Sequence, residues 1–76
     1  MMDYAEFIRL DAAFRRVRHE EFLKLHAELV GDQNGDLAWA WFRDDPLEFL
    51  VSYRNKRNLK LNRAIYALAV GKMKKP

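Results

Sequence analysis

The two histidines are the residues best suited to bind a metal ion or to transfer a proton at neutral pH. His19 and His26 lie seven residues apart. Two helical ligands of one metal ion are usually three or four residues apart, as in the H-E-x-x-H motif. Leu23 stands where that motif needs its second histidine. The spacing argues against a metal centre, and we predict no metal ligands in this chain.

Nucleophilic and acid–base groups are also sparse. Ser52 is the only serine, threonine and cysteine are absent, and no histidine is near Ser52 in the sequence, so a catalytic triad is not expected. The adjacent carboxylates of Asp44 and Asp45 precede Pro46, which is typical of a helix start rather than of an acid–base pair. We therefore predict no catalytic residue, no cofactor and a protein that is not an enzyme.

The loop at residues 31–36 is rich in side-chain oxygens, which raises the question of calcium. An EF-hand loop has glycine at its sixth position and glutamate at its twelfth. Counted from Asp32, glycine comes fourth and the twelfth residue is Arg43. The spacing therefore indicates a plain turn.

Helical periodicity organises the rest of the chain, and the fold class that we predict is all-α. Apolar residues recur every three or four positions over residues 3–30 and again over residues 46–70. Asp3 and Asp45 are suited to cap these helices, and Gly71 is suited to end the second one. We expect two long helices in an antiparallel hairpin. The alternatives are a bend near residues 18–21 and a break near residues 55–58.

A short aromatic helix is predicted at residues 37–43, between the two long ones. Trp39, Trp41 and Phe42 carry much of its surface, and large aromatic side chains dominate the energetics of protein interfaces. We predict that these three residues bind a partner protein. The alternative is that they close the open end of the hairpin.

Length and composition favour a single helical domain over residues 1–76. The chain is half hydrophobic, yet each helix of a hairpin covers only one face of the other, so we expect a homodimer. No apolar run is long enough for a membrane span. The early acids Asp3 and Glu6 do not suit a signal peptide. Together with the absence of cysteine, these features favour a cytoplasmic protein without membrane contact.

Charge is divided unevenly along the sequence. Residues 1–45 hold six basic and ten acidic residues, whereas residues 46–76 hold eight basic residues and one acid. One interpretation is that these charges are merely solvated or paired. The other is that a basic helix face binds an acidic protein, or nucleic acid through its phosphates. The residues predicted for that role are Lys56, Arg57, Lys60 and Arg63.

A polar layer is predicted across the middle of the hairpin. Arg54 falls on the apolar arc of its helix, where an unpaired guanidinium would be costly. An antiparallel hairpin places it opposite Leu23, one turn from Glu21. We expect a layer formed by Arg18, Glu21, Arg54 and Asn58, unless Arg54 simply extends to water.

The function that these features favour is a small adaptor or inhibitor that binds the surface of a partner protein. The alternative is a nucleic-acid-binding regulator that uses the basic helix 54–63. Exposed tryptophans would favour the first function, and buried tryptophans beside an uncovered basic face would favour the second.

Overall fold

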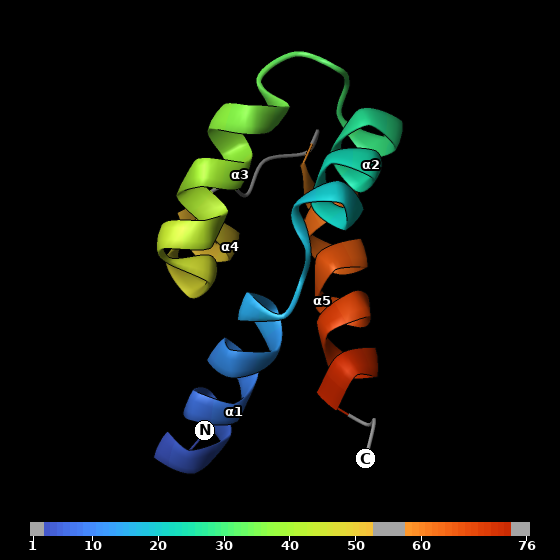
Figure 1. The fold of residues 1–76 in the computed structure, drawn as a ribbon. Coiled ribbons are helices and arrows are strands. Elements are labelled where there is room, and N and C mark those ends of the chain that lie inside the picture. Colours follow the sequence, from blue (N-terminus) through green and yellow to red (C-terminus); the bar gives the residue numbers. More distant parts are fainter. Residues whose placement is uncertain (1–2, 53–57, 74–76) are drawn as a thin grey trace.

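The computed structural model describes residues 3–52 and 58–73, and every regular element in these two ranges is a helix. The all-α prediction is therefore confirmed. Figure 1 shows α1 and α2 following one another up the molecule, with α5 running back down beside them. The helices are α1 (Tyr4–Arg15), α2 (His19–Leu29), α3 (Gly35–Asp44), α4 (Pro46–Ser52) and α5 (Leu59–Met73).

The first predicted long helix, residues 3–30, is interrupted between α1 and α2, so that prediction was wrong. The N–H of Val17 donates to the carbonyl of Phe14 at 3.1 Å, a tight turn that ends α1. Arg18 is extended, with a ψ of 155°, and a new helix starts after it. The side chain of Val17 is buried in the core. Val17 belongs to the apolar stripe of residues 3–30, but the periodicity of that stripe did not reveal the interruption.

The second predicted long helix, residues 46–70, is also not continuous. The side-chain amide of Asn62 donates to the carbonyl of Leu50 at 3.2 Å. Residues twelve apart in one straight helix would be about 18 Å apart, so Leu50 and Asn62 do not lie in one straight helix. Residues 53–57 lie outside the described ranges. The helix bounds therefore support the alternative prediction, a break near residues 55–58.

The predicted helix caps at Asp3 and Asp45 are confirmed, but one predicted helix end is not. Asp3 Oδ1 accepts the N–H of Glu6 at 2.8 Å, and Asp45 Oδ1 accepts the N–H of Glu48 at 3.2 Å. Gly71 was expected to end the last helix, yet α5 continues to Met73. The contacts of Lys72 with Glu21 and Arg16 hold this end of α5 in place. Tertiary contacts therefore outweigh the weak helix preference of glycine here.

Four phenylalanines from four different helices form the centre of the core: Phe14, Phe22, Phe42 and Phe49. Their ring centroids are 5.1 to 6.3 Å apart, with the closest contact between Phe22 and Phe42. Leu61 and Ile65 of α5 are buried in the same cluster. Each such side chain contributes about 1.5–3 kcal/mol on burial. The predicted aromatic helix is present as α3, which packs on α2 and α4.

Candidate functional site

The outer face of α3 carries the most exposed of the predicted partner-binding residues. Leu37 is 72% exposed and Trp41, one turn later, is 39% exposed. Residues four apart share a helix face, so these two side chains form one apolar surface. The ring of Trp41 meets Phe49 of α4 edge-on, at a centroid distance of 5.3 Å. A tryptophan supported in this way is well placed to serve as a rigid anchor for a partner.

The other two predicted anchors have different positions. Phe42 is only 1% exposed and belongs to the core, so its side chain contributes nothing to the surface. Trp39 is partly buried, with its ring stacked on His19 at 5.0 Å and tilted against Phe22 at 5.5 Å. The three side chains therefore differ in their surroundings: Phe42 lies in the core, Trp39 is partly buried, and Trp41 is exposed. We refer to Leu37 and Trp41 together as the α3 surface.

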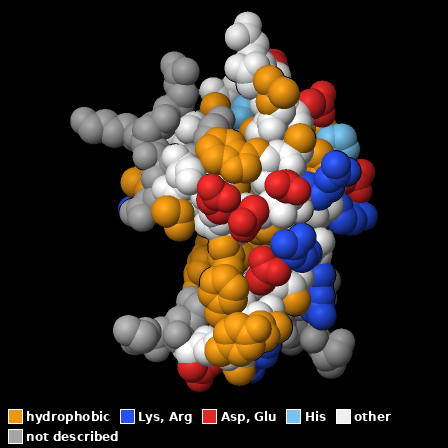
Figure 2. Space-filling view, turned by 90° about the vertical axis from the view of Figure 1, so that its left-hand side faces the viewer, with side chains coloured by type: hydrophobic (Ala, Val, Ile, Leu, Met, Phe, Trp, Pro, Cys, Tyr) orange, Lys and Arg blue, Asp and Glu red, His pale blue; other side chains and the backbone are white. Residues whose placement is uncertain are grey.

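Acidic side chains lie next to the α3 surface. Asp44 follows Trp41 by three residues and Glu48 lies on α4, and both are exposed. Figure 2 shows acidic side chains beside hydrophobic ones on this side of the molecule, which α1, α3 and α4 form. The carboxylate of Asp45 is instead used to cap α4. An apolar anchor beside exposed carboxylates suits a partner surface with an apolar pocket and basic residues next to it.

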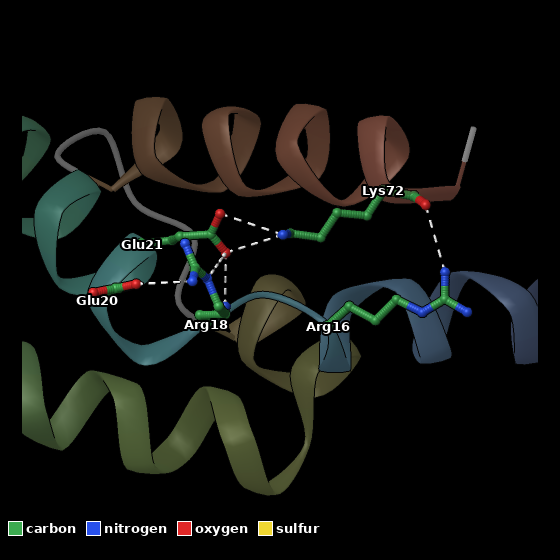
Figure 3. Close-up of polar contacts among 5 residues, drawn as sticks. All are labelled: Arg16, Arg18, Glu20, Glu21 and Lys72. Atoms are coloured by element: carbon green, nitrogen blue, oxygen red, sulfur yellow. Dashed lines mark hydrogen bonds and ion pairs between the residues drawn. The ribbon is translucent and has the colours of Figure 1, made fainter. Parts of the chain in front are cut away.

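A network of charged side chains holds the interruption between α1 and α2 (Figure 3). Glu21 Oε1 accepts the backbone N–H of Arg18 at 2.9 Å. The same carboxylate meets the ammonium of Lys72 on α5, with Nζ–O distances of 3.1 and 3.3 Å. The carbonyl of Lys72 in turn receives a long contact of 3.5 Å from the guanidinium of Arg16. Residues far apart in the sequence are thus fixed together at one point.

The Glu21 carboxylate is stabilised in its charged form by this network. The hydrogen bond from the backbone of Arg18 is the main reason that the pKa of Glu21 lies below its ordinary value, and Lys72 lowers that pKa further. Partial burial acts in the opposite direction. Glu20 makes an outer ion pair with Arg18 at 3.0 Å, but both side chains are largely exposed. Of these two acids, Glu21 therefore contributes more to holding the helices together.

The predicted polar layer is present only in part. The structure brings Arg18 and Glu21 together, at 3.7 Å between Arg18 Nε and Glu21 Oε1. The cation that Glu21 meets on the last helix is Lys72, whereas the predicted partner was Arg54. Asn58 is buried just before α5, and Arg54 lies outside the described residues. Two helix breaks changed the register on which the prediction of the layer depended.

The predicted nucleic-acid-binding residues are only partly described. Lys56 and Arg57 lie outside the described ranges. Lys60 and Arg63, on consecutive turns of α5, are both exposed. Arg63 also borders a shallow depression between α4 and α5 whose other lining residues are mainly apolar. The described part of the basic helix therefore combines positive charge with an apolar surface.

The sequence did not identify two exposed apolar areas. Tyr4, Phe7 and Ile8 project from the start of α1, and Val51 and Tyr66 are exposed beside the depression between α4 and α5. The periodic apolar stripes contained these residues, but only the tertiary structure shows which stripe positions remain uncovered. These two areas are candidate surfaces for self-association.

Both histidines have structural contacts. The Nδ1 of buried His26 lies 2.9 Å from the carbonyl of Gly31, where α2 ends. The Nε2 of His19 lies 3.3 Å from a carboxylate oxygen of Asp36. Within residues 3–52 and 58–73, no three histidine or carboxylate side chains are close enough to hold a metal ion.

Comparisons with known proteins add no family assignment. No family model matches the sequence, and neither curated proteins nor solved structures give a significant match. None of the helices in the described ranges has both the length and the apolar character needed to cross a membrane.

Proposed function

We propose that this protein is a small, non-enzymatic interaction protein, an adaptor or inhibitor that acts by covering the surface of a partner protein. The observation that carries the proposal is the exposure of Leu37 and Trp41 on one face of α3. An exposed tryptophan supported by a buried phenylalanine is typical of an interface anchor. We propose the cytoplasm as its location, because a chain without cysteine suits a reducing compartment.

The partner would have a concave apolar site with basic residues near it. Leu37 and Trp41 would enter the apolar site, and Asp44 and Glu48 would lie close to the basic residues. Charges at the rim of an interface mainly affect the association rate, whereas the buried anchor determines how long the complex lasts. Replacing the tryptophan should therefore increase the dissociation rate, and replacing an acid should make association slower and less dependent on salt.

Affinity capture from the native host, with nuclease present and absent, tests this proposal. A double variant with Leu37→Ala and Trp41→Ala should lose a protein that the unaltered chain captures. Met73→Ala is the matched control, because Met73 has the same exposed fraction as Trp41 but lies on α5. The captured protein should then bind the purified chain directly in calorimetry. Equal capture by all three forms would refute a role for the α3 surface.

A second candidate function is nucleic-acid binding through the basic helix. It is favoured by the exposure of Lys60 and Arg63 three residues apart on α5, since neighbouring cations can contact successive phosphates. Fluorescence anisotropy with labelled RNA and DNA at low salt would test it. Affinity should fall steeply as salt rises, and replacing Lys56, Lys60 and Arg63 by glutamate should abolish it. No binding at low salt would eliminate this candidate.

Assembly as a homodimer is also part of the proposal. It is supported by apolar side chains of α1, α4 and α5 that the chain itself leaves exposed. Sedimentation at micromolar concentrations would reveal the assembly, and a stable monomer over that range would contradict it.

A further inference from the structure

The first turns of α1 form an ordered helix whose apolar face is only partly covered within the described structure. All residues from Asp3 to Arg9 are exposed, and Tyr4 is 78% exposed. Tyr4, Phe7 and Ile8 share one face because they are three and four residues apart. The cap at Asp3 starts this helix firmly, with a 2.8 Å hydrogen bond. We call residues 3–9 the α1 arm.

A preformed apolar depression lies between α4 and α5. It has a volume of about 340 Å³. The hydrogen bond from Asn62 to the carbonyl of Leu50 fixes α4 against α5, so the two walls are already in position. Val51 is 68% exposed at its edge. We call this depression the α4–α5 groove; it is lined by Leu50, Val51, Leu59, Asn62, Arg63 and Tyr66.

The arm cannot fill the groove of its own chain. Phe14 of α1 touches Tyr66 of the groove, with ring centroids 6.2 Å apart. Tyr4 lies ten residues before Phe14 on the same straight helix, which is about 15 Å further away. Figure 2 shows hydrophobic side chains on α1 and a column of them running up from α1 toward the upper half of the molecule. The arm and the groove of one chain therefore lie apart, and only a second chain can bring them into contact.

We propose that the protein forms a two-fold symmetric dimer in which the α1 arm of each copy lies in the α4–α5 groove of the other. This inference rests on the proposed self-association and is independent of partner capture through Trp41. In such an assembly the interface is used twice, as two-fold symmetry requires. Tyr4, Phe7 and Ile8 of one copy would cover Val51, Leu59 and Tyr66 of the other.

Charge and area both favour a second copy as the occupant. The arm carries Asp3 and Glu6 against one cation, Arg9, whereas Arg63 lines the groove and Lys60 is exposed three residues before it. Arm-to-groove contacts therefore join opposite charges, and groove-to-groove contacts would join like charges. Two such contacts would bury an area on the order of 1,200 Å², which lies at the lower end for specific interfaces.

Two glutamate variants and their mixture test this arrangement by sedimentation. Phe7→Glu damages only the arm and Val51→Glu damages only the groove, and each should raise the dimer dissociation constant at least tenfold. Their mixture keeps one intact arm and one intact groove, so it should form a heterodimer more readily than either variant associates alone. Leu37→Glu, on the α3 surface, is the matched control and should leave the dimer unchanged. Circular dichroism checks that every variant is folded.

Disulfide trapping provides a second readout that does not depend on affinity. The chain has no cysteine, so Ile8→Cys and Val51→Cys can be introduced separately into two batches and mixed under oxidation. The disulfide between the two variants should form faster than either homodimeric disulfide.

Different failures have different meanings. A dimer that persists in both glutamate variants would overturn the arm-to-groove arrangement but leave self-association intact. A dimer broken by Phe7→Glu but not by Val51→Glu would indicate arm-to-arm contact and would also overturn it. A monomeric unaltered chain would overturn self-association itself, and the role of the α3 surface would still be open to its own test.

Discussion

Replacing Glu21 is the most direct test of how the helices are joined. Its carboxylate accepts the N–H of Arg18 at 2.9 Å and pairs with Lys72 at 3.1 Å. It therefore caps the start of α2 and holds the end of α5 at the same time. Glu21→Ala removes both contacts, whereas Glu21→Gln keeps an oxygen that can accept the backbone hydrogen bond but removes the charge.

The expected loss follows from these two contacts. A capping hydrogen bond at a helix N-terminus contributes about 1 kcal/mol. An ion pair of this kind contributes about 0.2–1 kcal/mol, and the upper part of that range applies because the two side chains are only 20% and 22% exposed. Glu21→Ala should therefore lower the free energy of unfolding by about 1–2 kcal/mol, or about 4–16 °C in melting temperature. Glu21→Gln should cost about half as much.

Urea denaturation followed by circular dichroism measures this loss, at one fixed protein concentration because association affects stability. Glu20→Ala is the matched control: Glu20 is adjacent, also pairs with Arg18, and is 73% exposed. Its replacement should cost less than about 0.5 kcal/mol. A double-mutant cycle with Lys72→Met should give a positive coupling energy with Glu21→Ala, since the two groups touch.

The pH dependence supplies an independent check. Because the folded state lowers the pKa of Glu21 below its ordinary value of 4.5, its stabilising effect is complete well above pH 4.5. The effect should disappear as the pH falls through the lowered pKa. The stability difference between the unaltered chain and Glu21→Gln should therefore shrink in acid. A difference that is independent of pH, or a loss no larger than that of Glu20→Ala, would refute this account of the network.

Four further substitutions have defined expectations, and chemical denaturation measures each. Phe22→Ala should cost about 3–5 kcal/mol because it empties the centre of the core, and a loss below 1 kcal/mol would contradict that packing. Gly31→Ala should cost about 1–3 kcal/mol because its φ is +145°, although nothing lies within 4 Å of an added Cβ. Gly35→Ala should cost less than Gly31→Ala, since the tightest contact of its added Cβ would be the end of the Leu23 side chain at 3.1 Å, and the His26 ring at 3.6 Å is at an ordinary contact distance. Asn62→Leu should cost about 1–3 kcal/mol because a buried backbone carbonyl of α4 loses its donor, and a neutral result would show that this contact does not hold α4 to α5.

Local signals were predictable from the sequence because they act within one helical turn. The caps at Asp3 and Asp45 form as expected, with hydrogen bonds to residues three positions later. The aromatic segment is a helix, as its position between Asp36 and Pro46 indicated. Each of these features depends on neighbours in the chain, whose identity the sequence states directly.

The candidate site was less predictable, because exposure depends on what the rest of the chain covers. Trp39, Trp41 and Phe42 look equivalent as a run of aromatic residues. In the structure, one is stacked on His19, one is exposed, and one is buried at 1% exposure. Helical geometry alone separates their directions, but the position of the core decides which direction faces inward.

Helix continuity was decided by the tertiary structure. The stripes before and after each interruption are in phase in the sequence, which favoured two long helices. Burial of Val17 and the contact between Asn62 and Leu50 instead favour shorter helices that fold back on one another. A chain of 76 residues buries more apolar surface in several short helices than in a two-helix hairpin. The sequence by itself determined the helical class, the helix caps at Asp3 and Asp45 and the uneven charge. Packing alone determined where the helices stop and which apolar residues remain for a partner, because both depend on contacts between residues far apart in the chain.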